Sequence, residues 1–436
     1  MAKSIHHAFV ERYGVPAGWN AMRLRELVSF LGGGTPDSDV SAFWGGDIPW
    51  LTPTEMTTIE GRFASNSERT LTRAGLESAR CSLLEPGTLV MSTRGTVGNV
   101  VIAGVPLTCN QSCEALVPKE SASSDYLYFV LTYWRPLIER MAAGTTFKSI
   151  TRRDIRDLWF SVPDVDERDQ ITNALIAVED AIAAAGEELT AAIRIRTALM
   201  QQLFTKGIPG RSKSVQTIVV FRKPVDIPKR WEPSRLGAST VLVQYGTNAA
   251  SNGYRGGYPV IAIPEVVALR LELGDVPYAD IPESEARDLR LEENDVLLIR
   301  TNGNPAYMGK STLITADVAR QHVVFASYLI RVRTDQDRLR GAYLNYFLAS
   351  PLGRRQALAM ANTSAGNHNL GARSLRQFWI PRPDPDEQDE IVTILHRCED
   401  AIDALQDKVE ALLRLKKSLL QNLLTGKVRV AKGVTV

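Results

Sequence analysis

The chain has 436 residues, enough for two or three domains that each bury a core of their own. A hydrophobic content of 44% and a charged content of 23% are those of an ordinary globular protein, and no apolar run reaches the ~18 residues of a membrane span. With a net charge of only +2, a polyanionic partner would have to be met by local basic patches. The N-terminus lacks an apolar segment of signal-peptide length, so we expect a cytoplasmic protein with no membrane contact.

The first module, residues 1–162, is predicted to be a mixed α/β domain of short strands and turns, because Gly and Pro are frequent throughout it. It opens with a proline and a tryptophan, Trp19, and a β-rich stretch then ends at Arg94. An alternating strand at 113–117 follows, and the segment 126–141 is predicted to be helical. A polar loop leads to the closing strand.

Residues 163–207 are predicted to form a long helix. Their apolar residues alternate in steps of four and three over five heptads, which keeps one stripe facing a partner helix in a coiled coil. At 1.5 Å per residue, ~40 residues make a rod of roughly 60 Å. The predicted seam is Ile171, Leu175, Val178, Ile182, Ala185, Leu189, Ala192, Arg196, Leu199 and Leu203.

Residues 208–382 contain a linker and a second α/β module with the same order of elements. A proline and Trp231 open it, a β-rich stretch ends at Arg300, and the segment 339–361 is predicted to be helical. The middles of the two modules differ, and we expect the segment 32–53 to have no counterpart in 241–265.

Residues 383–436 contain a second copy of the long helix, followed by a tail. Residues 163–205 align without a gap to residues 383–425, and 18 of the 43 positions are identical. A repeat of this length predicts two similar helices that pair with one another. The repeated seam is Ile391, Leu395, Cys398, Ile402, Leu405, Val409, Leu412, Lys416, Leu419 and Leu423.

Charge is polarised along both helices, with acidic first halves and basic last thirds. Antiparallel pairing would set acidic against basic segments, whereas parallel pairing would set like against like, so we expect antiparallel helices. Arg196 and Lys416 interrupt the seam at equivalent positions. Their side chains could extend to solvent, fix the register of the pair, or meet an acidic partner.

The ordered, duplicated set of motifs resembles the specificity (S) subunit of type I restriction–modification systems over nearly the whole chain. No single motif is specific by itself. Beside the helix openings at Pro163 and Pro383, the motifs are Gly33-Gly34-Thr35-Pro36, Trp44-Gly45-Gly46-Asp47-Ile48-Pro49-Trp50, Arg94-Gly95-Thr96-Val97-Gly98, Asn110-Gln111, Gly144-Thr145-Thr146-Phe147-Lys148, Arg300-Thr301-Asn302, Gly309-Lys310 and Asn367-His368-Asn369-Leu370.

The resemblance implies two α/β target-recognition domains held apart by two long antiparallel helices with a pseudo-twofold repeat. Each domain would read one half of a bipartite site on double-stranded DNA, and the helices would set the spacer. The family's S subunit is not an enzyme. It docks two methyltransferase (M) subunits and, in the full complex, restriction (R) subunits, so S-adenosylmethionine, ATP and Mg are expected on partner subunits and no cofactor in this chain. The absence of a G-x-x-x-x-G-K-[ST] motif agrees with this expectation.

Candidate DNA contacts are basic and amide side chains near predicted turns, because Lys and Arg bind phosphates and Arg, Asn, Gln and Thr read base edges. The alternative for each is a structural role as an ion pair, a turn or a solvated surface. The four tryptophans of the closing strands and of the 44–50 segment are expected in the core. The candidates are Thr93, Arg94, Asn110, Gln111, Lys148, Arg152 and Arg153 in the first module, and Arg300, Thr301, Asn302, Lys310, Asn367, His368, Asn369 and Arg373 in the second.

The sequence is compatible with two other functions. The segment Asn304-Pro305-Ala306-Tyr307 is similar to the Asn-Pro-Pro-Tyr loop of adenine methyltransferases, but the second proline differs and no glycine-rich cofactor site precedes it. A coiled-coil scaffold with two protein-binding modules is the other alternative. The resemblance implies no catalytic residues in this chain. No metal site is expected, since Cys109 and Cys113 have no second Cys or His pair nearby.

Overall fold

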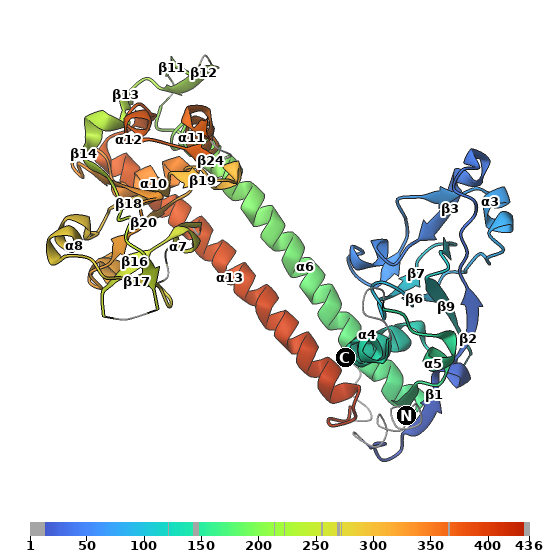
Figure 1. Cartoon of the computed structure of the whole chain (residues 1–436). Coiled ribbons are helices and arrows are strands. Elements are labelled where there is room, and N and C mark those ends of the chain that lie inside the picture. Colours follow the sequence, from blue (N-terminus) through green and yellow to red (C-terminus); the bar gives the residue numbers. More distant parts are fainter. Residues whose placement is uncertain are drawn as a thin grey trace. The chain divides into compact units, whose positions relative to one another are not determined.

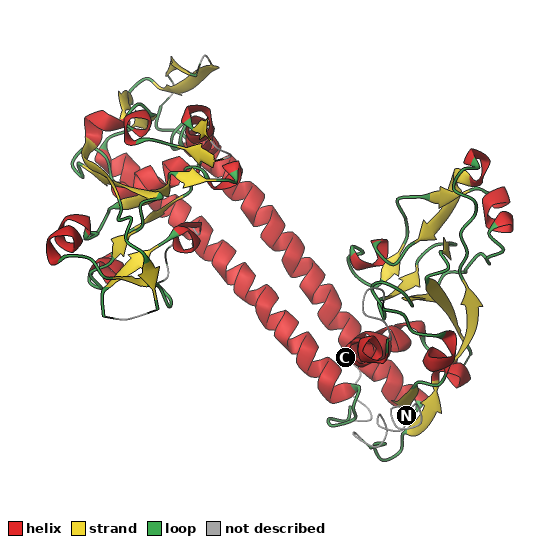
Figure 2. Ribbon diagram, in the orientation of Figure 1, coloured by secondary structure: helices red, strands yellow, loops and turns green. Residues whose placement is uncertain are grey.

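The computed structural model describes residues 14–430 except 121, 143–147, 213, 222, 254–255, 268–270, 272 and 365–366. The chain forms two compact units, whose elements Figure 1 labels. Unit 1 contains the residues up to Gly186 and those from Asp407 onward, and unit 2 contains Glu187–Gln406. Each unit combines one mixed α/β domain with part of both long helices (Figure 2), as the resemblance implied. In the part of the chain described, no helix is both long enough and apolar enough to cross a membrane.

The domain of unit 1 is built around a five-stranded sheet of order β2-β9-β6-β7-β4, whose central strands β6 and β7 are wholly buried. A second sheet has the order β5-β3-β8, and β1 pairs with β10. The strands are β1 (Asn20–Arg23), β2 (Val28–Gly32), β3 (Trp44–Leu51), β4 (Phe63–Ala64), β5 (Thr70–Leu71), β6 (Leu89–Ser92), β7 (Val100–Ala103), β8 (Thr108–Cys109), β9 (Cys113–Pro118) and β10 (Trp159–Val162), and the helices are α2 (Leu24–Leu27), α3 (Arg73–Ser78), α4 (Ser124–Met141) and α5 (Arg152–Arg156), with 3-10 turns η1 (Ser41–Phe43) and η2 (Glu55–Thr57).

The domain of unit 2 contains sheets of order β14-β22-β18-β20, β15-β17-β16-β21 and β19-β24-β23, and the pairs β11-β12 and β13-β25. The strands are β11 (Val215–Val220), β12 (Lys223–Pro228), β13 (Glu232–Arg235), β14 (Thr240–Tyr245), β15 (Ser251–Asn252), β16 (Tyr258–Ile261), β17 (Tyr278–Ala279), β18 (Val296–Ile299), β19 (Thr301–Asn302), β20 (Ser311–Leu313), β21 (Val324–Phe325), β22 (Leu329–Thr334), β23 (Asn362–Ser364), β24 (Asn367–Asn369) and β25 (Trp379–Arg382). The helical elements are α7 (Ile263–Val267), α8 (Glu283–Leu289), α9 (Ala316–Ala319), α10 (Gly341–Ala349), α11 (Pro351–Met360), α12 (Ala372–Leu375), η3 (Leu236–Ser239) and η4 (Pro305–Tyr307).

The two domains share one backbone frame, including the part expected to differ. The parallel pair β3–β8 sets Leu51 opposite Cys109, and β16–β21 sets Ile261 opposite Phe325. The Gly34 N–H donates to the Cys109 carbonyl at 2.9 Å, as the Thr247 N–H does to that of Phe325. The prediction that 32–53 has no counterpart in 241–265 was therefore wrong. The side chains diverged while the main-chain pairing stayed.

The long helices α6 (Val165–Leu203) and α13 (Pro385–Leu423) start alike. Each is preceded by an aspartate, Asp164 or Asp384, whose carboxylate accepts the N–H of the glutamate three residues later at 2.9 Å. An acceptor at this place satisfies a free N–H of the first turn, and its charge suits the positive helix end. Most buried seam residues lie toward the helix ends, but Ala185 and Ile402 are buried near the helix middles. The buried seam residues are Ile171, Leu175, Ala185, Leu203, Ile391, Leu395, Ile402 and Leu423, whereas Val178, Ile182, Leu189, Leu199, Leu405, Val409, Leu412 and Leu419 are half-buried.

The residues that interrupt the seam form the same ion pair twice. In unit 1 the Lys416 Nζ lies 2.6 Å from a carboxylate oxygen of Glu179. In unit 2 the Arg196 guanidinium donates to both carboxylate oxygens of Glu399 at 3.2 Å. Since each residue is the repeat equivalent of one in the other pair, only an antiparallel arrangement makes both pairs. The expected orientation is thus confirmed, and the interrupting side chains have acidic partners.

A charge-reversal series tests this pair. Arg196→Glu should lower the free energy of unfolding by about 3 kcal/mol, because it sets a second carboxylate against the nearly buried Glu399. Adding Glu399→Arg should restore most of the loss, as measured by urea unfolding followed by circular dichroism.

The control is Arg414→Glu, whose partner Glu410 lies four residues away on an exposed helix face. It should change the free energy by less than about 0.5 kcal/mol. Equal losses for Arg196→Glu and Arg414→Glu would contradict a structural role of the seam pair.

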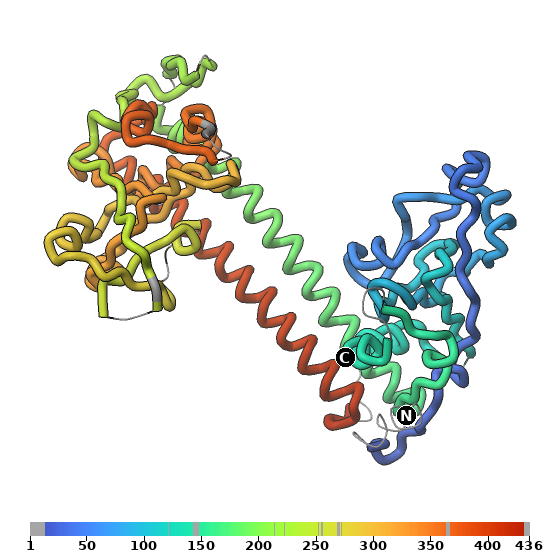
Figure 3. The backbone as a smooth tube through the Cα atoms, in the orientation of Figure 1, coloured from blue at the N-terminus to red at the C-terminus, as the bar shows by residue number. Residues whose placement is uncertain are grey.

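Each domain is fastened to the start of its long helix by a buried glutamate. Glu167 accepts the indole N–H of Trp19 at 2.9 Å, and Glu387 accepts that of Trp231 at 2.8 Å. A guanidinium completes each site, supplied by Arg429 of the tail at 2.6 Å in unit 1 and by Arg230 at 2.5 Å in unit 2. Figure 3 traces the tail from α13 toward the segment that carries Trp19.

The Arg429 guanidinium holds the pKa of Glu167 below its usual range, although burial opposes the shift. A carboxylate with a lowered folded pKa stabilises the protein above its ordinary pKa of about 4.3, and this contribution is lost as the pH falls through the lowered value. The attachment of the first domain to α6 is therefore sensitive to acid.

Trp19→Phe should cost about 1–3 kcal/mol at neutral pH, because the ring is kept while the buried carboxylate loses a donor. Thermal unfolding followed by circular dichroism provides the measurement. In the control Trp44→Phe the lost bond is to the exposed Asp37 carbonyl, so the effect should stay near 0.5 kcal/mol. If Trp19→Phe lowered the free energy of unfolding no more than Trp44→Phe does, the bond from Trp19 to Glu167 would not hold the domain to α6.

Candidate nucleic-acid interface

A polar groove of about 650 Å³ opens on the domain of unit 1. Three of the residues predicted to contact DNA line it, namely Arg94, Asn110 and Lys148. They come from three distant segments of the chain and meet on one surface. The other lining residues are Thr52, Pro53, Thr54, Gly95, Thr96, Ser112 and Ser149.

Main-chain contacts hold these segments together. Arg94 forms a β-bridge with Ser149, and the Gly95 N–H donates to the Lys148 carbonyl at 3.1 Å. The Asn110 N–H donates to the Leu51 carbonyl at 2.9 Å, which places the turn after β8 beside the residues that follow β3. The segments that line the groove are therefore joined to one another by main-chain hydrogen bonds.

The chemistry of the groove suits the readout of nucleic acid. The side chains of Arg94 and Lys148 are exposed, and no ion pair of either is found among the described residues. The Asn110 side-chain carbonyl accepts the Ser112 N–H at 2.9 Å, so its orientation is fixed. A guanidinium and an amide are the groups that discriminate guanine and adenine in the major groove, while a lysine can bind phosphate.

The other predicted residues of the first domain lie elsewhere. Thr93 is buried, and both its N–H and its hydroxyl donate to the Ser112 carbonyl, at 2.7 and 3.0 Å. Gln111 is exposed and accepts the hydroxyl of Thr35. Arg152 binds Glu114 at 2.6 Å, and Arg153 is exposed on α5. The motif residues Gly144–Phe147 lie outside the described residues.

Unit 2 presents a small polar sheet at the equivalent place. Strand β19 pairs with β24, with Thr301 opposite Asn369 and Asn302 opposite His368. The Thr301 hydroxyl donates to the Asn369 side-chain carbonyl at 2.8 Å, and Asn367 begins the same strand. Five predicted residues thus come together on one sheet, where amides and an imidazole replace the cations of unit 1.

The remaining predicted residues of unit 2 are separate from this sheet. The Arg300 guanidinium lies 4.5 Å from the centre of the Tyr245 ring and donates to the Ser327 carbonyl at 3.1 Å. Arg373 is exposed on α12. Lys310 lines a different cavity.

The two strand-ending arginines are not equivalent, although the sequence suggested that they were. The Ile150 N–H donates to the carbonyl of Thr93 in unit 1, and the Leu370 N–H donates to that of Arg300 in unit 2. Arg300 therefore occupies the position of Thr93, one residue before that of Arg94. Since successive side chains of a strand point to opposite faces, Arg300 is turned away from the face that carries Arg94.

Comparisons with known proteins agree on one family. Residues 16–193 match the family model described as the type I restriction modification DNA specificity domain. The chain is 27% identical to the MjaIX specificity subunit of Methanocaldococcus jannaschii over 54% of each protein, so the match spans about half of that relative. It is 21% identical to the EcoKI specificity subunit of Escherichia coli K12 over 77% of this chain and 72% of the relative.

Two solved structures share the fold. The S subunit of the type I system of M. genitalium superposes with a TM-score of 0.55 at 13% identity, covering 93% of this chain and 96% of that one. A chain from a study of complex assembly and conformational transition in the type I system reaches 0.60 at 16% identity, covering 95% and 100%. The family model, the relatives and the M. genitalium structure all describe type I specificity subunits, and this chain is similar to them in sequence and in fold.

Some residues that line the groove had not been predicted from the sequence. Thr52, Thr54 and Ser149 join the groove because β3 runs parallel to β8 and because Ser149 bridges to Arg94. The only signal in the sequence is the position of Thr52 and Thr54 directly after a strand, which many surface threonines share.

Asn304, in the segment similar to a methyltransferase loop, accepts the Ala306 N–H at 2.9 Å and caps a 3-10 turn.

Proposed function

We propose that this specificity subunit reads a bipartite site on double-stranded DNA, one half with the domain of each unit. The observation that carries the proposal is that one backbone frame presents two different polar surfaces at equivalent positions. The surface of unit 1 has Arg94, Asn110 and Lys148, and that of unit 2 has the amides and the imidazole of β19 and β24. A shared frame with unlike side chains is what two readers of different half-sites require.

The chain's own role in this proposal is recognition without catalysis. The two long helices set the unread spacer between the half-sites and dock two M subunits, and R subunits join the complete complex. S-adenosylmethionine, ATP and Mg belong to those partners. The described residues contribute the DNA contacts and the geometry that orients them.

Exchanging the first domain tests the assignment of half-sites. Residues 15–160 are replaced by the first domain of another family member, and the methylated motif is determined by genome-wide modification sequencing. One half-site should change and the other should stay. A change in both halves, or in neither, would refute the modular reading.

Single variants test the groove itself. In the assembled complex with M subunits, Arg94→Ala should weaken DNA binding by about 1–3 kcal/mol and relax the first half-site only. Lys148→Ala should weaken binding to all sequences and reduce the slope of log K against log salt by about 1. Both effects are measured by titration of labelled duplex at several salt concentrations.

The control is Lys119→Ala, because the Lys119 Nζ donates to the Arg25 carbonyl away from the groove. Its affinity and salt slope should equal those of the wild type. If Arg94→Ala left both half-sites unchanged, the groove would not be the reading surface.

The helices carry a duplicated apolar feature that fits the docking of two copies of one partner. Ile193 and Ile195 on α6 are 37% and 62% exposed, and their repeat equivalents Leu413 and Leu415 on α13 are 49% and 45% exposed. Ile195 and Leu415 occupy repeat-equivalent positions, so each long helix offers an exposed aliphatic side chain at the same place to a partner protein. One such pair in each unit supports one M subunit for each unit.

The double variant Ile195→Glu with Leu415→Glu should therefore abolish co-purification with the M subunit, measured by size-exclusion chromatography with light scattering. Each single variant should leave one M subunit bound. Val241→Glu serves as the control, since Val241 is 68% exposed on β14 of the α/β domain. Loss of both M subunits in the control, or of none in the double variant, would contradict the docking surface.

A further inference from the structure

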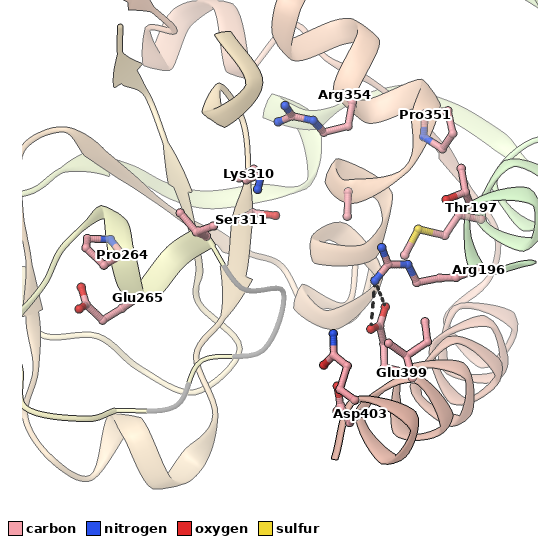
Figure 4. A pocket seen from close by; sticks show the side chains of 15 residues that line it. Arg196, Thr197, Pro264, Glu265, Lys310, Ser311, Pro351, Arg354, Glu399 and Asp403 are labelled. Atoms are coloured by element: carbon pink, nitrogen blue, oxygen red, sulfur yellow. Dashed lines mark hydrogen bonds and ion pairs between the residues drawn. The ribbon is translucent and has the colours of Figure 1, made fainter. Parts of the chain in front are cut away.

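A second cavity, of about 830 Å³, lies within unit 2 (Figure 4). Side chains of the α/β domain form one wall, including Lys310, Pro351 and Arg354. Residues of the two long helices form the other. The helix residues are Arg196, Thr197 and Met200 of α6 and Glu399, Ile402, Asp403 and Gln406 of α13.

The wall of the α/β domain carries two cations, Lys310 and Arg354, and one carboxylate, Glu265, which accepts the Ala262 N–H at 2.8 Å. Burial and the charge of Arg354 lower the pKa of Lys310. Arg354 donates to the main-chain carbonyls of Met308 and Ala306, which hold its guanidinium in place. In the described part of unit 2, neither Lys310 nor Arg354 takes part in an ion pair. Lys310 and Arg354 are both half-buried, and their like charges favour an anion beside them.

The start of α11 adds to this positive potential. The helix has ten residues and begins at Pro351, which lines the cavity. Ser350 caps it by accepting the Gly353 N–H at 3.2 Å. The partial positive charge of a helix start favours anions. The helix start therefore lies on the same wall as Lys310 and Arg354, which also holds the carboxylate of Glu265.

Unit 1 provides an internal comparison, because the same frame is neutral at this place. The N–H groups of Gly98 and Gly309 make equivalent bonds at 2.9 Å, so Asn99 occupies the position of Lys310. A side chain at Gly98 would approach Arg135, as one at Gly309 would approach Arg354. Arg135 is paired with Glu139 at 2.7 Å, and the equivalent cavity holds only about 240 Å³. The unpaired cations are thus specific to unit 2.

The rest of the cavity accommodates an organic group. Met200, Val267 and Ile402 supply apolar surface, and the Arg196–Glu399 pair closes one side. The volume falls within the ~300–1,000 Å³ range of small-molecule sites. Phosphate is the anion that best suits a lysine, a fixed guanidinium and a helix start together.

We propose that this cavity binds a phosphate-bearing ligand, with the phosphate against Lys310 and Arg354 at the start of α11. The phosphate can belong to a nucleotide-sized small molecule or to the DNA backbone. The proposal does not rest on DNA recognition, since a free nucleotide would use the same contacts.

The test compares the full chain with Lys310→Asn, which installs the residue of unit 1. Binding of ATP and of inorganic phosphate is measured by calorimetry, and binding of duplex DNA by fluorescence anisotropy. Lys310→Asn should weaken phosphate binding about tenfold, as the loss of one charge-assisted bond implies, and Lys310→Glu should abolish it. Lys223→Asn, at an exposed lysine of β12, is the control and should bind like the wild type. Circular dichroism verifies that the variants are folded.

The two sources of phosphate give different results. Loss of ATP or phosphate binding with unchanged DNA affinity identifies a small-molecule site. Loss of DNA affinity in Lys310→Asn without any binding of free phosphates identifies a backbone contact. If Lys310→Asn and Lys310→Glu leave all three ligands as in the wild type, or if Lys223→Asn has the same effect, the proposal is overturned.

Discussion

The ion pair between the long helices is the constraint on which the rest of the architecture depends. Glu179 meets Lys416 in unit 1, and Glu399 meets Arg196 in unit 2. Because the four residues occupy two repeat positions, the pairing is satisfied twice only when the helices are antiparallel and in one register. A shift by a turn would separate Glu399 from Arg196 and Glu179 from Lys416, and Glu399 would then be a buried carboxylate without this cation, whereas Glu179 would keep Arg62 at 2.6 Å. Charge therefore selects the register, and apolar contact supplies the bulk of the stabilisation.

Duplication also makes each unit a control for the other. In both units a buried glutamate at the start of a long helix accepts the indole N–H of a tryptophan. The arginine that pairs with this glutamate, however, comes from a different part of the chain in each unit. Likewise, one cavity wall carries Asn99 with a paired arginine and its counterpart carries Lys310 with an unpaired one. Where the two units share a backbone position but differ in side chain, the difference points to function more directly than the features of either unit alone. Side chains that both units share are those that the fold needs.

The long helices could be predicted from the sequence because a 3-4 apolar spacing and a repeated segment are local signals. Their antiparallel direction followed from charge. The groove of unit 1 was foreseen only in part: Arg94, Asn110 and Lys148 meet there, but Thr52 and Ser149 join through strand pairings that sequence spacing does not reveal. The sequence also predicted that Arg94 and Arg300 occupy equivalent positions, whereas they differ by one residue in the hydrogen-bond register. In a strand one residue reverses the face, and only the hydrogen-bond register defines it.

The tail contact of Arg429 has a consequence for biosynthesis. Unit 2 is one continuous stretch, Glu187–Gln406, and its arginine stands beside its tryptophan. Unit 1 needs residues from both sides of that stretch, since Leu423 and Leu424 enter its core and Arg429 neutralises Glu167. A growing chain can complete unit 2 while the earlier domain still holds a buried carboxylate without its cation. The domain translated first is thus the last to be finished, and a ribosome that stops short of residue 429 releases a product whose incomplete half is its N-terminal one.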